Sequence, residues 1–526
     1  MNTVYDYHQR TKHRFNAYAK GPDFLDWDTQ PNPYRRFAGS PLITLPLAAE
    51  HCAVTYPELF EGRIPPSPGT IHSLGLLLEL SFGLSAIKQY GEDQWALRCN
   101  PSSGNLHPTE VYVIANGVPD LASGVYHYAS YEHGLELRCQ ADWPQAGIWV
   151  GFSSIHWREA WKYGERAFRY CQHDIGHALG ALRYAAAVLG WRVEWQHTMS
   201  DAELAAVLGV DRDMDFMDAE PETPDLLVRL VTERQPDAAT TPALMPQHIV
   251  AGNWHGQANR LSAHHLHHWP IIDTISQATR KPRTQPAPQY QAQCPAPTRA
   301  DPAHSAARLI LQRRSAQSFD KTATLSLAAF LRMMESCLPH TDRPPFDVWP
   351  WPPRVHLLLF VHRVESLAPG LYLLFRDEST ADRELARLPV EYTRIRVTQT
   401  PKLPLYKLIE SDFIKTAKIL SCQQAIAGDS AFSLSMLAEF DTALACGPWA
   451  YRHLYWETGL IGQSLYLEAE ASGVRGTGIG CFFDDAVHEV LKLGDTHLQS
   501  LYHFTVGTPL PDTRLHTLPA YAHRVL

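Results

Sequence analysis

A loop sequence at residues 100–108, NPSSGNLHP, combines two hydroxyls, amide side chains, a histidine and a glycine directly before a predicted strand. Proline and glycine in such a stretch favour a turn. The side chains and free backbone groups of this turn place donors and acceptors at one spot, which suits the polar edge of a planar heterocycle. On composition alone, an ordinary connecting turn is an equally good interpretation.

Two arginines and two hydroxyls lie close together at residues 313–320, RRSAQSFD. The planar guanidinium group of arginine binds phosphate through two parallel hydrogen bonds. We expect a helix before this segment, with Asp301 as its N-cap and Pro302 in its first turn. The alternative is a solvated helix end whose cations interact with the negative end of the helix dipole.

A glycine-rich segment at residues 473–480, GVRGTGIG, allows backbone amides to approach an anion or a flavin edge closely. Its spacing differs from that of the dinucleotide-binding fingerprint, and it does not follow a first strand. A Rossmann domain is therefore not expected.

Histidine and cysteine patterns give no strong metal site. His264 and His268 would share a helix face within residues 262–269, but no carboxylate or cysteine nearby completes a ligand shell. A short polar helix is the favoured alternative, and no metal is expected. The nine cysteines are odd in number and contain no CxxC pair, so neither a disulfide framework nor a thiolate zinc site is expected.

These segments need elements to position them, and the two halves of the chain offer similar elements in a similar order. Residues 163–190 and 450–473 each combine tyrosine and arginine with a buried helix pattern that ends at glycine. Strand patterns precede them at residues 110–115 and 124–128, and at residues 355–361 and 370–375. The sequence therefore predicts a tandem duplication of one α+β unit, paired face to face as an internal dimer.

Length and composition agree with this division. The chain has 526 residues, 45% of them hydrophobic and only 19% charged, which indicates several domains with large covered surfaces. We expect an N-terminal wrapping arm at residues 1–60, a first domain at 61–237, a proline-rich linker at 238–300 and a second domain at 301–526. The net charge of −9 argues against nucleic acid as a partner. The polar N-terminus and the lack of a long apolar run indicate a cytoplasmic protein with no membrane partner.

Taken together, the motifs resemble the flavin-dependent nitroreductase superfamily, in particular its branch of SagB/ThcOx-type azoline dehydrogenases. The resemblance rests on residues 98–110 (RCNPSSGNLHPTE), 123–128 (SGVYHY) and 162–170 (KYGERAFRY), and in the second half on 313–320 and 476–485 (GTGIGCFFDD). It covers about residues 65–235 and 300–512. It implies an α+β fold of two tandem nitroreductase-like domains, each a mixed or antiparallel sheet flanked by helices, that form an intramolecular pseudo-dimer.

The resemblance implies FMN at the interface between the halves. The polar loop occurs only in the first half, since residues 347–353 of the second half, DVWPWPP, offer no comparable set, and the Arg-Ser and glycine segments occur only in the second. One FMN site per chain is therefore inferred. Its implied ligands are Arg98, Pro101, Ser102, Ser103, Gly104, Asn105, His107, Arg313, Arg314, Ser315, Gln317, Gly478, Ile479, Gly480 and Arg514.

One departure concerns the phosphate segment. The family commonly has a further arginine where this sequence has Gln317, which removes one charge from the phosphate site. Arg313, Arg314 and Arg514 would then have to balance the phosphate, although glutamine can still donate a hydrogen bond.

Lys162 and Tyr163 are the catalytic candidates that the resemblance implies. Oxidation of an azoline to an azole removes a hydride to the flavin and a proton from the neighbouring carbon. A lysine in an apolar or cationic setting can accept that proton, with tyrosine as relay or orienting group. The alternative is a surface lysine at a helix start beside a packing tyrosine.

The expected function is that of an FMN-dependent oxidoreductase, with dehydrogenation of azoline rings in a modified peptide as the first choice. The first alternative is NAD(P)H-dependent reduction of a nitro compound or quinone, with NAD(P)H as electron donor. The second is a flavin-free binding or scaffold subunit. The expected partners are the small-molecule or modified-peptide substrate and biosynthetic partner proteins, and the chain is expected as a pseudo-dimeric monomer or a higher homo-oligomer.

Overall fold

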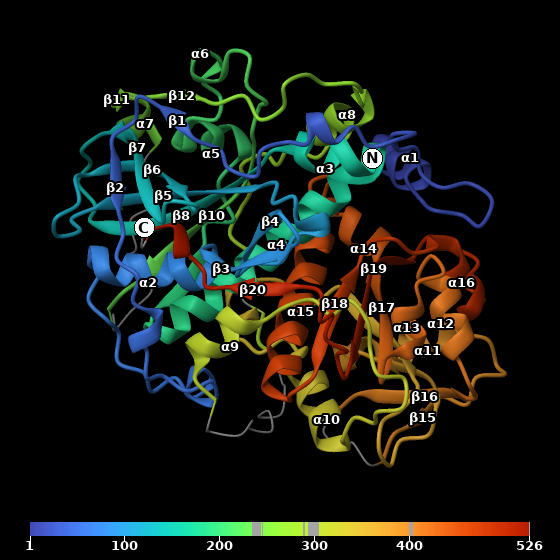
Figure 1. Cartoon of the computed structure of the whole chain (residues 1–526). Coiled ribbons are helices and arrows are strands. Elements are labelled where there is room, and N and C mark those ends of the chain that lie inside the picture. The colour runs from blue at the N-terminus through green and yellow to red at the C-terminus, as the bar shows by residue number, and fades with distance from the viewer. Residues whose placement is uncertain (234–243, 245, 288–289, 293–303, 399–402, 525–526) are drawn as a thin grey trace.

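Two antiparallel sheets, one from each half of the chain, lie on either side of a pair of long helices (Figure 1). The computed structural model describes residues 1–233, 244, 246–287, 290–292, 304–398 and 403–524. The first sheet has the order β11 (Asn253–Trp254), β7 (Gly134–Gln140), β6 (Gly124–Ala129), β5 (Thr109–Asn116), β8 (Gly147–Ser154), β10 (Thr223–Val231), β9 (Arg192–Trp195), with β2 (Leu42–Thr44) also on β7. The second has the order β15 (Ile395–Arg396), β16 (Leu405–Glu410), β14 (Gly370–Leu374), β13 (Val355–Val361), β17 (Phe432–Glu439), β19 (Leu498–Gly507), β18 (Arg475–Ile479).

The two sheets share one topology. Each half contains a hairpin, β5 with β6 in the first and β13 with β14 in the second. A later strand of the same half, β8 or β17, pairs with the first strand of that hairpin. The long helix then leads to the edge strand, β9 or β18, and the chain returns through β10 or β19 to pair with both. The predicted α+β fold of two tandem units is therefore confirmed.

The long helices α4 (Ala167–Val188) and α15 (Ala450–Ala471) form the contact between the halves. Every residue of both is buried, charged side chains such as Arg169 and Glu457 included. They cross at Gly176 and Gly459, each nine residues after its helix start. A Cβ on Gly176 would lie 2.2 Å from the Trp456 carbonyl oxygen, and one on Gly459 would lie 2.4 Å from that of His173. The near-identity of these contacts places a pseudo-twofold axis at the crossing.

Shorter helices cover the remaining faces. Buried apolar residues of α5 and α7 pack on the outer face of the first sheet, and those of α11, α12 and α16 pack on the second. The bounds of these and the other helices are α1 (Asn2–Arg10), α2 (Ile71–Ser81), α3 (His156–Tyr163), α5 (Asp201–Leu208), α6 (Asp213–Phe216), α7 (Pro246–Val250), α8 (Pro270–Ala278), α9 (Ala306–Gln312), α10 (Leu327–Ser336), α11 (Ala381–Arg387), α12 (Ile414–Leu420), α13 (Ala425–Asp429), α14 (Phe440–Leu444) and α16 (Asp484–Leu491).

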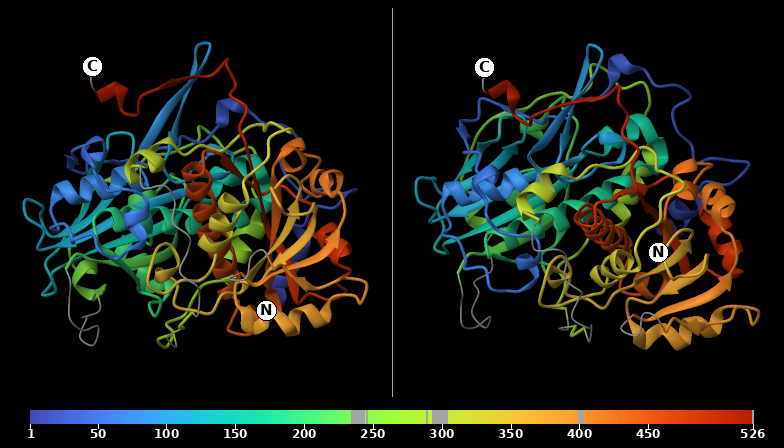
Figure 2. Two further views of the ribbon diagram at one scale, coloured as in Figure 1. Left: turned by 90° about the horizontal axis from the view of Figure 1, so that it is seen from below. Right: turned by 60° about the horizontal axis from the view of Figure 1, so that its bottom comes forward.

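A third sheet joins the C-terminal segment to the first half. Its strands are β3 (Leu84–Tyr90), β4 (Asp93–Arg98) and β20 (His516–Leu518), with β20 antiparallel to β3. Figure 2 shows the C-terminal chain leaving the second half and running beside the projecting β3–β4 hairpin to the first half. Residues after about 509 therefore pack mainly on the first half, although the predicted second domain extends to residue 526.

The other predicted boundaries also differ from the packing. Within residues 1–60, β2 joins the first sheet, β1 (Phe37–Ala38) pairs with β12 (Gln257–Ala258), and α1 is wedged between the halves. The described part of the predicted linker is packed against the rest of the protein. Its residues Ile249, Ile272 and Ile275 are buried, and β11 extends the first sheet. Long-range pairing of short segments such as these leaves little trace in local sequence patterns.

Two local predictions about helix positions need correction. The predicted polar helix at 262–269 is irregular backbone, and α8 begins only at Pro270. Asp301 and Pro302, the predicted start of the next helix, lie outside the described residues; α9 has Ser305 as its N-cap, whose side chain accepts from the Arg308 amide. Among the residues that the structure describes, no helix is long and apolar enough to cross a membrane.

Candidate functional site

A cavity of about 580 Å³ opens between the halves, beneath the β3–β4 hairpin. Segments from both halves and from the C-terminal chain line it. The structure brings together there most of the residues that the sequence singled out: Arg98, Pro101, Ser102, Ser103, Gly104, Asn105, His107, Arg313, Arg314, Ser315, Gln317, Gly478 and Gly480. Its volume is that of an ordinary small-molecule or cofactor site.

The polar loop of the first half connects β4 to β5 and holds its shape by internal hydrogen bonds. The Ser102 hydroxyl accepts from the His107 amide at 2.8 Å, and the Asn105 side-chain oxygen lies 2.9 Å from His107 Nε2. Gly104, Asn105 and His107 all have left-handed backbone conformations, with φ of 60°, 60° and 50°. Such conformations are uncommon for non-glycine residues and concentrate at functional sites.

Cations from three elements surround one end of the cavity. Arg313 and Arg314 follow α9, Arg475 begins β18, and Lys88 lies on β3. Burial and the nearby charges of Arg314 and Arg475 lower the pKa of Lys88, and burial together with Arg313 lowers the pKa of Arg314 to about 10. Mutual repulsion of this kind is relieved by a bound anion, so the cluster suits a phosphate group.

The two halves depend on each other for this geometry. Arg313 donates to the carbonyl oxygens of Cys99 and Arg98 at 3.2 and 3.3 Å, and Arg314 donates to that of Ser85 at 2.9 Å. Arg313 of the second half therefore holds the start of the first half's polar loop, and Arg314 holds strand β3 beside it. Ser315 is fixed in turn by the Tyr466 hydroxyl at 2.8 Å.

The glycine segment is an edge strand, β18, and not a free loop. Its glycines allow close contact with aromatic rings: a Cβ on Gly478 would lie 1.9 Å from the Tyr502 hydroxyl, and one on Gly480 would lie 2.3 Å from the Tyr170 ring. At an edge, a strand leaves backbone groups unpaired on one side. Two of these groups are bonded within the protein, since the Gly476 carbonyl oxygen accepts from the Ala316 amide at 3.2 Å and the Gly478 amide donates to the Tyr466 hydroxyl at 2.9 Å. Gly478 and Gly480 bring the backbone to the cavity wall.

A pair of buried carboxylic acids lies beneath the polar loop. Asp174 lines the cavity and its Oδ1 accepts from the Ser103 amide at 3.3 Å, while Glu159 lies behind it on α3. Apart from the Ser102 hydroxyl, no donor among the described residues serves Asp174 Oδ2 or either Glu159 oxygen. Burial raises the pKa of Asp174 to about 8, and burial with the Asp174 charge raises that of Glu159 well above its usual range. Both acids therefore hold a proton more tightly than ordinary carboxyls do, and ionisation of one opposes ionisation of the other.

Lys162 and Tyr163 end α3 at the edge of this site. A Cβ on Gly104 would lie 2.6 Å from the Tyr163 hydroxyl and 3.3 Å from Lys162 Nζ, so both polar ends contact the polar loop. Burial and the Glu159 charge raise the pKa of Tyr163 well above its usual range, which keeps the phenol protonated. The pair therefore lies close to the cavity without being among its lining residues.

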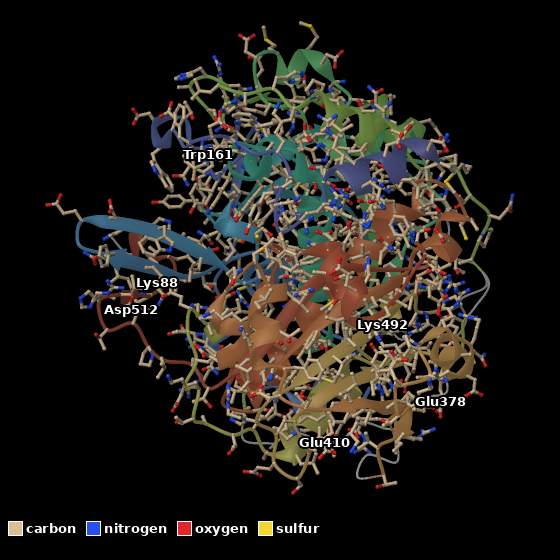
Figure 3. The ribbon with its side chains drawn as sticks, turned by 90° about the vertical axis from the view of Figure 1, so that its right-hand side faces the viewer. Lys88, Trp161, Glu378, Glu410, Lys492 and Asp512 are labelled. Carbon is tan, nitrogen blue, oxygen red and sulfur yellow. The ribbon has the colours of Figure 1, made fainter. Side chains whose placement is uncertain are left out.

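Two predicted ligands lie elsewhere. Arg514 is exposed, pairs with Asp512 at 2.8 Å and lies over the Tyr90 ring, outside the cavity lining. Figure 3 shows Asp512 beside Lys88, where the C-terminal chain passes the hairpin. The Ile479 side chain is buried in the second sheet, so only its backbone is available.

Sequence reasoning missed several lining residues. Lys88, Asp174, His177, Tyr466, Arg475, Tyr502 and the chain at 509–512 all contribute to the cavity. Arg475 lies inside the glycine segment that the sequence singled out, and its charge was the available signal. The sequence around Lys88 gives no sign that this residue lies at the site, because β3 is brought beside the C-terminal wall of the cavity by its pairing with the distant strand β20.

The pseudo-twofold axis relates this cavity to a smaller one of about 290 Å³ on the other side of the long helices. There Arg183, sixteen residues after the start of α4 as Tyr466 is in α15, forms two hydrogen bonds of 2.7 Å with Asp347. Asp342 and Glu233 also line it. Arg192 and Glu58 line it as well, so its carboxylates outnumber its arginines, and this second cavity does not suit a phosphate.

Among the described residues, no group of three or more histidine, cysteine or acidic side chains is arranged to hold a metal ion. In the histidine-rich stretch, His265 pairs with Glu220 at 2.9 Å and stacks on Trp157. This histidine therefore packs the predicted linker segment against the first half.

Comparisons with known proteins agree with this architecture. No family model matches the chain. A crystal structure from Anabaena variabilis, described as a "putative nitroreductase", superposes with a TM-score of 0.70 at 21% identity, over 97% of this chain and 99% of that one. A Methanocaldococcus jannaschii protein named a "putative nitroreductase" is 26% identical over 158 residues, which are 27% of this chain and 76% of that protein. The chain therefore has a nitroreductase-like fold in a tandem, two-unit form.

Proposed function

We propose that the chain is an FMN-dependent oxidoreductase with one site between its two halves. The observation that carries this proposal is the single cavity in which a polar loop of the first half meets a cation cluster and a glycine strand of the second. The likeness to proteins described as nitroreductases supports the oxidoreductase class. In the pseudo-symmetric cavity, Arg183 is paired with Asp347 and is not available to an anion, which supports one site per chain.

The residues present fit FMN. Arg313, Arg314, Arg475 and Lys88 would hold the phosphate, and the repulsion among them is the feature that an anion relieves. The loop at 102–105 and the glycines that line the cavity, Gly478 and Gly480, would contact the ring system. When bound, FMN supplies the acceptor or donor of a hydride. Gln317 lines the cavity and contributes a neutral donor where an arginine would add charge.

Within this class we propose oxidation of an azoline ring in a modified peptide as the reaction. Loss of two hydrogens from the azoline ring, one as a hydride and one as a proton, needs a base next to the reacting carbon. Lys162 Nζ would accept the proton at the edge of the polar loop. Tyr163 would remain protonated and donate a hydrogen bond that orients the substrate or the lysine, and Glu159, whose carboxyl interacts with the Lys162 charge, would lie beside the lysine.

NAD(P)H-linked reduction of a nitro compound or quinone is the second candidate, and the names of the two similar proteins favour it. Such a reduction does not need a base at Lys162. The two candidates therefore make different predictions for that residue.

Two measurements test these proposals. The purified full-length chain should be yellow or should take up one equivalent of FMN, whereas a colourless protein that binds no FMN would support a flavin-free scaffold. Lys162→Ala should abolish oxidation of a thiazoline peptide and leave NAD(P)H oxidation with a quinone nearly unchanged. Lys418→Ala, at an exposed lysine of α12, is the matched control and should change neither activity. Equal loss of both activities in Lys162→Ala would mean that Lys162 holds the cofactor or the fold.

A further inference from the structure

Two cysteines far apart in the sequence meet beside the cavity. Cys422 follows α12, and Cys481 follows Gly480, which lines the cavity. Their thiols lie within hydrogen-bonding reach of each other, and both side chains are partly exposed. Two further hydrogen bonds fix the backbones around them: Gln424 Nε2 donates to the Cys481 carbonyl oxygen at 3.2 Å, and the Phe483 amide donates to that of Leu420 at 2.8 Å.

The surroundings favour ionisation of Cys481. The Ala19 amide donates to His13 Nδ1 at 3.0 Å, so the ring proton of a neutral His13 is on Nε2 and can be donated to the Cys481 sulfur. The Cys422 thiol is a second donor, and the Arg166 guanidinium adds a positive charge nearby. These contacts lower the pKa of Cys481 to about 5, with the hydrogen bond from Cys422 as the largest cause.

The other described cysteines lack this setting. Cys99, Cys139 and Cys337 are buried, and burial raises the pKa of each to about 12; burial also raises that of Cys171. Cys446 is exposed and has no such neighbours among the described residues, so it serves as an internal reference thiol. A stabilised thiolate next to a second thiol is the arrangement of a thiol–disulfide exchange site.

We propose that Cys422 and Cys481 form a redox-active dithiol that exchanges with small-molecule disulfides, independently of any cofactor in the neighbouring cavity. The Cys481 thiolate attacks one sulfur of the small disulfide and releases one thiol, leaving a mixed disulfide on Cys481. Cys422 then loses its proton and attacks the Cys481 sulfur, which forms the Cys422–Cys481 disulfide and releases the second thiol. The two cysteines lose two electrons and the small disulfide gains them. One released thiol takes the Cys422 proton, and the other takes, through solvent, the proton that Cys481 gave up on ionisation.

The bond would link the loop after α12 to the segment after β18. That segment is already tied to the first half, because Arg166 and Tyr170 of the first half both donate to the Gly480 carbonyl oxygen, at 3.1 and 3.2 Å. Oxidation would also remove the thiolate that faces His13 of the N-terminal arm. The dithiol therefore lies where a change of redox state acts on the junction of the arm, the two halves and the cavity.

The test uses the full-length chain and glutathione disulfide as the probe, with alkylation of free thiols and peptide mass spectrometry. In the wild type we expect a peptide crosslinked through Cys422 and Cys481. Cys422→Ser should instead accumulate one glutathione on Cys481, because the resolving thiol is missing, and Cys446→Ser should form the crosslink as the wild type does. The proposal is overturned if the wild type forms no crosslink, or if Cys422→Ser gains no adduct on Cys481.

A second measurement needs no variant. At pH 6, iodoacetamide should alkylate Cys481 of the reduced wild type about tenfold or more faster than Cys446, because the pKa of Cys481 is lowered to about 5 and the thiolate is the reactive form. Equal rates for the two cysteines would contradict the proposed thiolate.

Discussion

At the scale of single residues, the cavity acid Asp174 and its pseudo-symmetric counterpart Glu457 differ in whether a cation is paired with them. Asp174 of α4 and Glu457 of α15 each lie seven residues after their helix start. Glu457 is paired with the Arg376 guanidinium and accepts from the Arg354 amide, whereas no cation among the described residues forms an ion pair with Asp174. An unpaired buried acid is costly to ionise, so its retention at the cavity suggests a role in holding a proton.

This difference predicts opposite effects for two matched substitutions. The pKa of Asp174 is raised to about 8, so the folded state binds its proton more tightly than the unfolded state does. Its favourable contribution is complete below the unfolded pKa and is lost as the pH rises towards 8. Asp174→Asn should therefore raise the free energy of unfolding at pH 8 by about 1–3 kcal/mol and change it little at pH 4.

Glu457→Gln is the control, because it leaves Arg376 buried without its partner. It should lower the free energy of unfolding at pH 8 by about 3–5 kcal/mol. Denaturant titrations at pH 4 and pH 8 measure both variants. A loss of stability in Asp174→Asn that is the same at both pH values would show that Asp174 is an ordinary hydrogen-bonding residue.

The arginines provide a second prediction at this scale. Arg475 lines the cavity and pairs only with Glu470 among the described acids, whereas Arg514 lies outside the cavity. Arg475→Gln should weaken FMN binding about tenfold, the effect of losing one charge-assisted contact, and Arg514→Gln should leave it unchanged. Quenching of FMN fluorescence on titration measures both. The opposite ranking would support the sequence-based role for Arg514 as a phosphate ligand.

Most of the candidate site could be predicted at this scale because its residues cluster in three short motifs. Ser102 and Ser103 lie within one loop, and Arg313 and Arg314 are adjacent. Lys88 and Asp174 could not be predicted, since their place in the site depends on strand pairing across the chain and on which face of a fully buried helix meets the cavity. Arg514 was misplaced for the same reason, because its segment runs along the hairpin towards the first half.

At the scale of elements, the crossing of α4 and α15 brings the halves together. Glycine is needed there because a Cβ on Gly176 would lie 2.2 Å from the Trp456 carbonyl oxygen and 2.8 Å from Gly459 Cα. Both atoms belong to the backbone of the partner helix, which cannot move aside without separating the helices. The interface, and with it the cavity, therefore depends on these two positions.

Gly176→Ala should force the helices apart. We expect a loss of about 1–3 kcal/mol in the free energy of unfolding from overpacking, together with weaker FMN binding. Gly494→Ala is the control, because a Cβ there meets no atom within 4 Å and the backbone is not left-handed. Thermal unfolding of both variants, with and without FMN, tests this. Equal stability of the two variants would contradict a close helix contact.

Helices and strands with a clear pattern of apolar residues could be predicted from the sequence. The helix patterns at 163–190 and 450–473 correspond to α4 and α15, which end two residues before the left-handed Gly190 and Gly473. The predicted strand at 355–361 coincides with β13. The hairpin of β3 and β4 was not predicted, because its sequence is largely polar and exposed at its tip and has no apolar alternation.

At the scale of the whole molecule, both ends of the chain join the halves. From the N-terminal arm, the Tyr5 hydroxyl donates to Asp441 and the Tyr7 hydroxyl to the Glu165 carbonyl oxygen, both at 2.7 Å. Asp484 of the second half accepts from Arg166 and Arg169 of the first at 3.1 and 2.7 Å, and these charges hold its pKa well below the usual range. These contacts connect the two halves into one folded unit. The repeated sequence pattern predicts that two similar halves exist, but not the contacts that connect them.

The C-terminal chain has a specific role in this unit, because it forms one wall of the cavity. Pro509, Leu510, Pro511, Asp512, Leu515 and Thr517 line it. Beyond β20, the Tyr521 hydroxyl anchors the chain by donating to the Ser130 carbonyl oxygen at 3.0 Å and accepting from the Leu84 amide at 2.9 Å. Since the wall is held mainly by this anchor and by β20, its removal should open the cavity without unfolding either main sheet.

Truncation of the chain after Leu510 should therefore raise the Kd for FMN at least about tenfold, a loss of about 1.4 kcal/mol, while far-ultraviolet circular dichroism stays close to that of the full chain. Tyr521→Phe keeps β20 and removes only the hydroxyl contacts, so its effect on the Kd should be smaller, about two- to fivefold. Fluorescence titration with FMN ranks the three proteins. An unchanged Kd after truncation would show that the cofactor binds below the wall, on the polar loop, the arginines and β18 alone, and that the C-terminal chain instead limits access of larger substrates to the cavity.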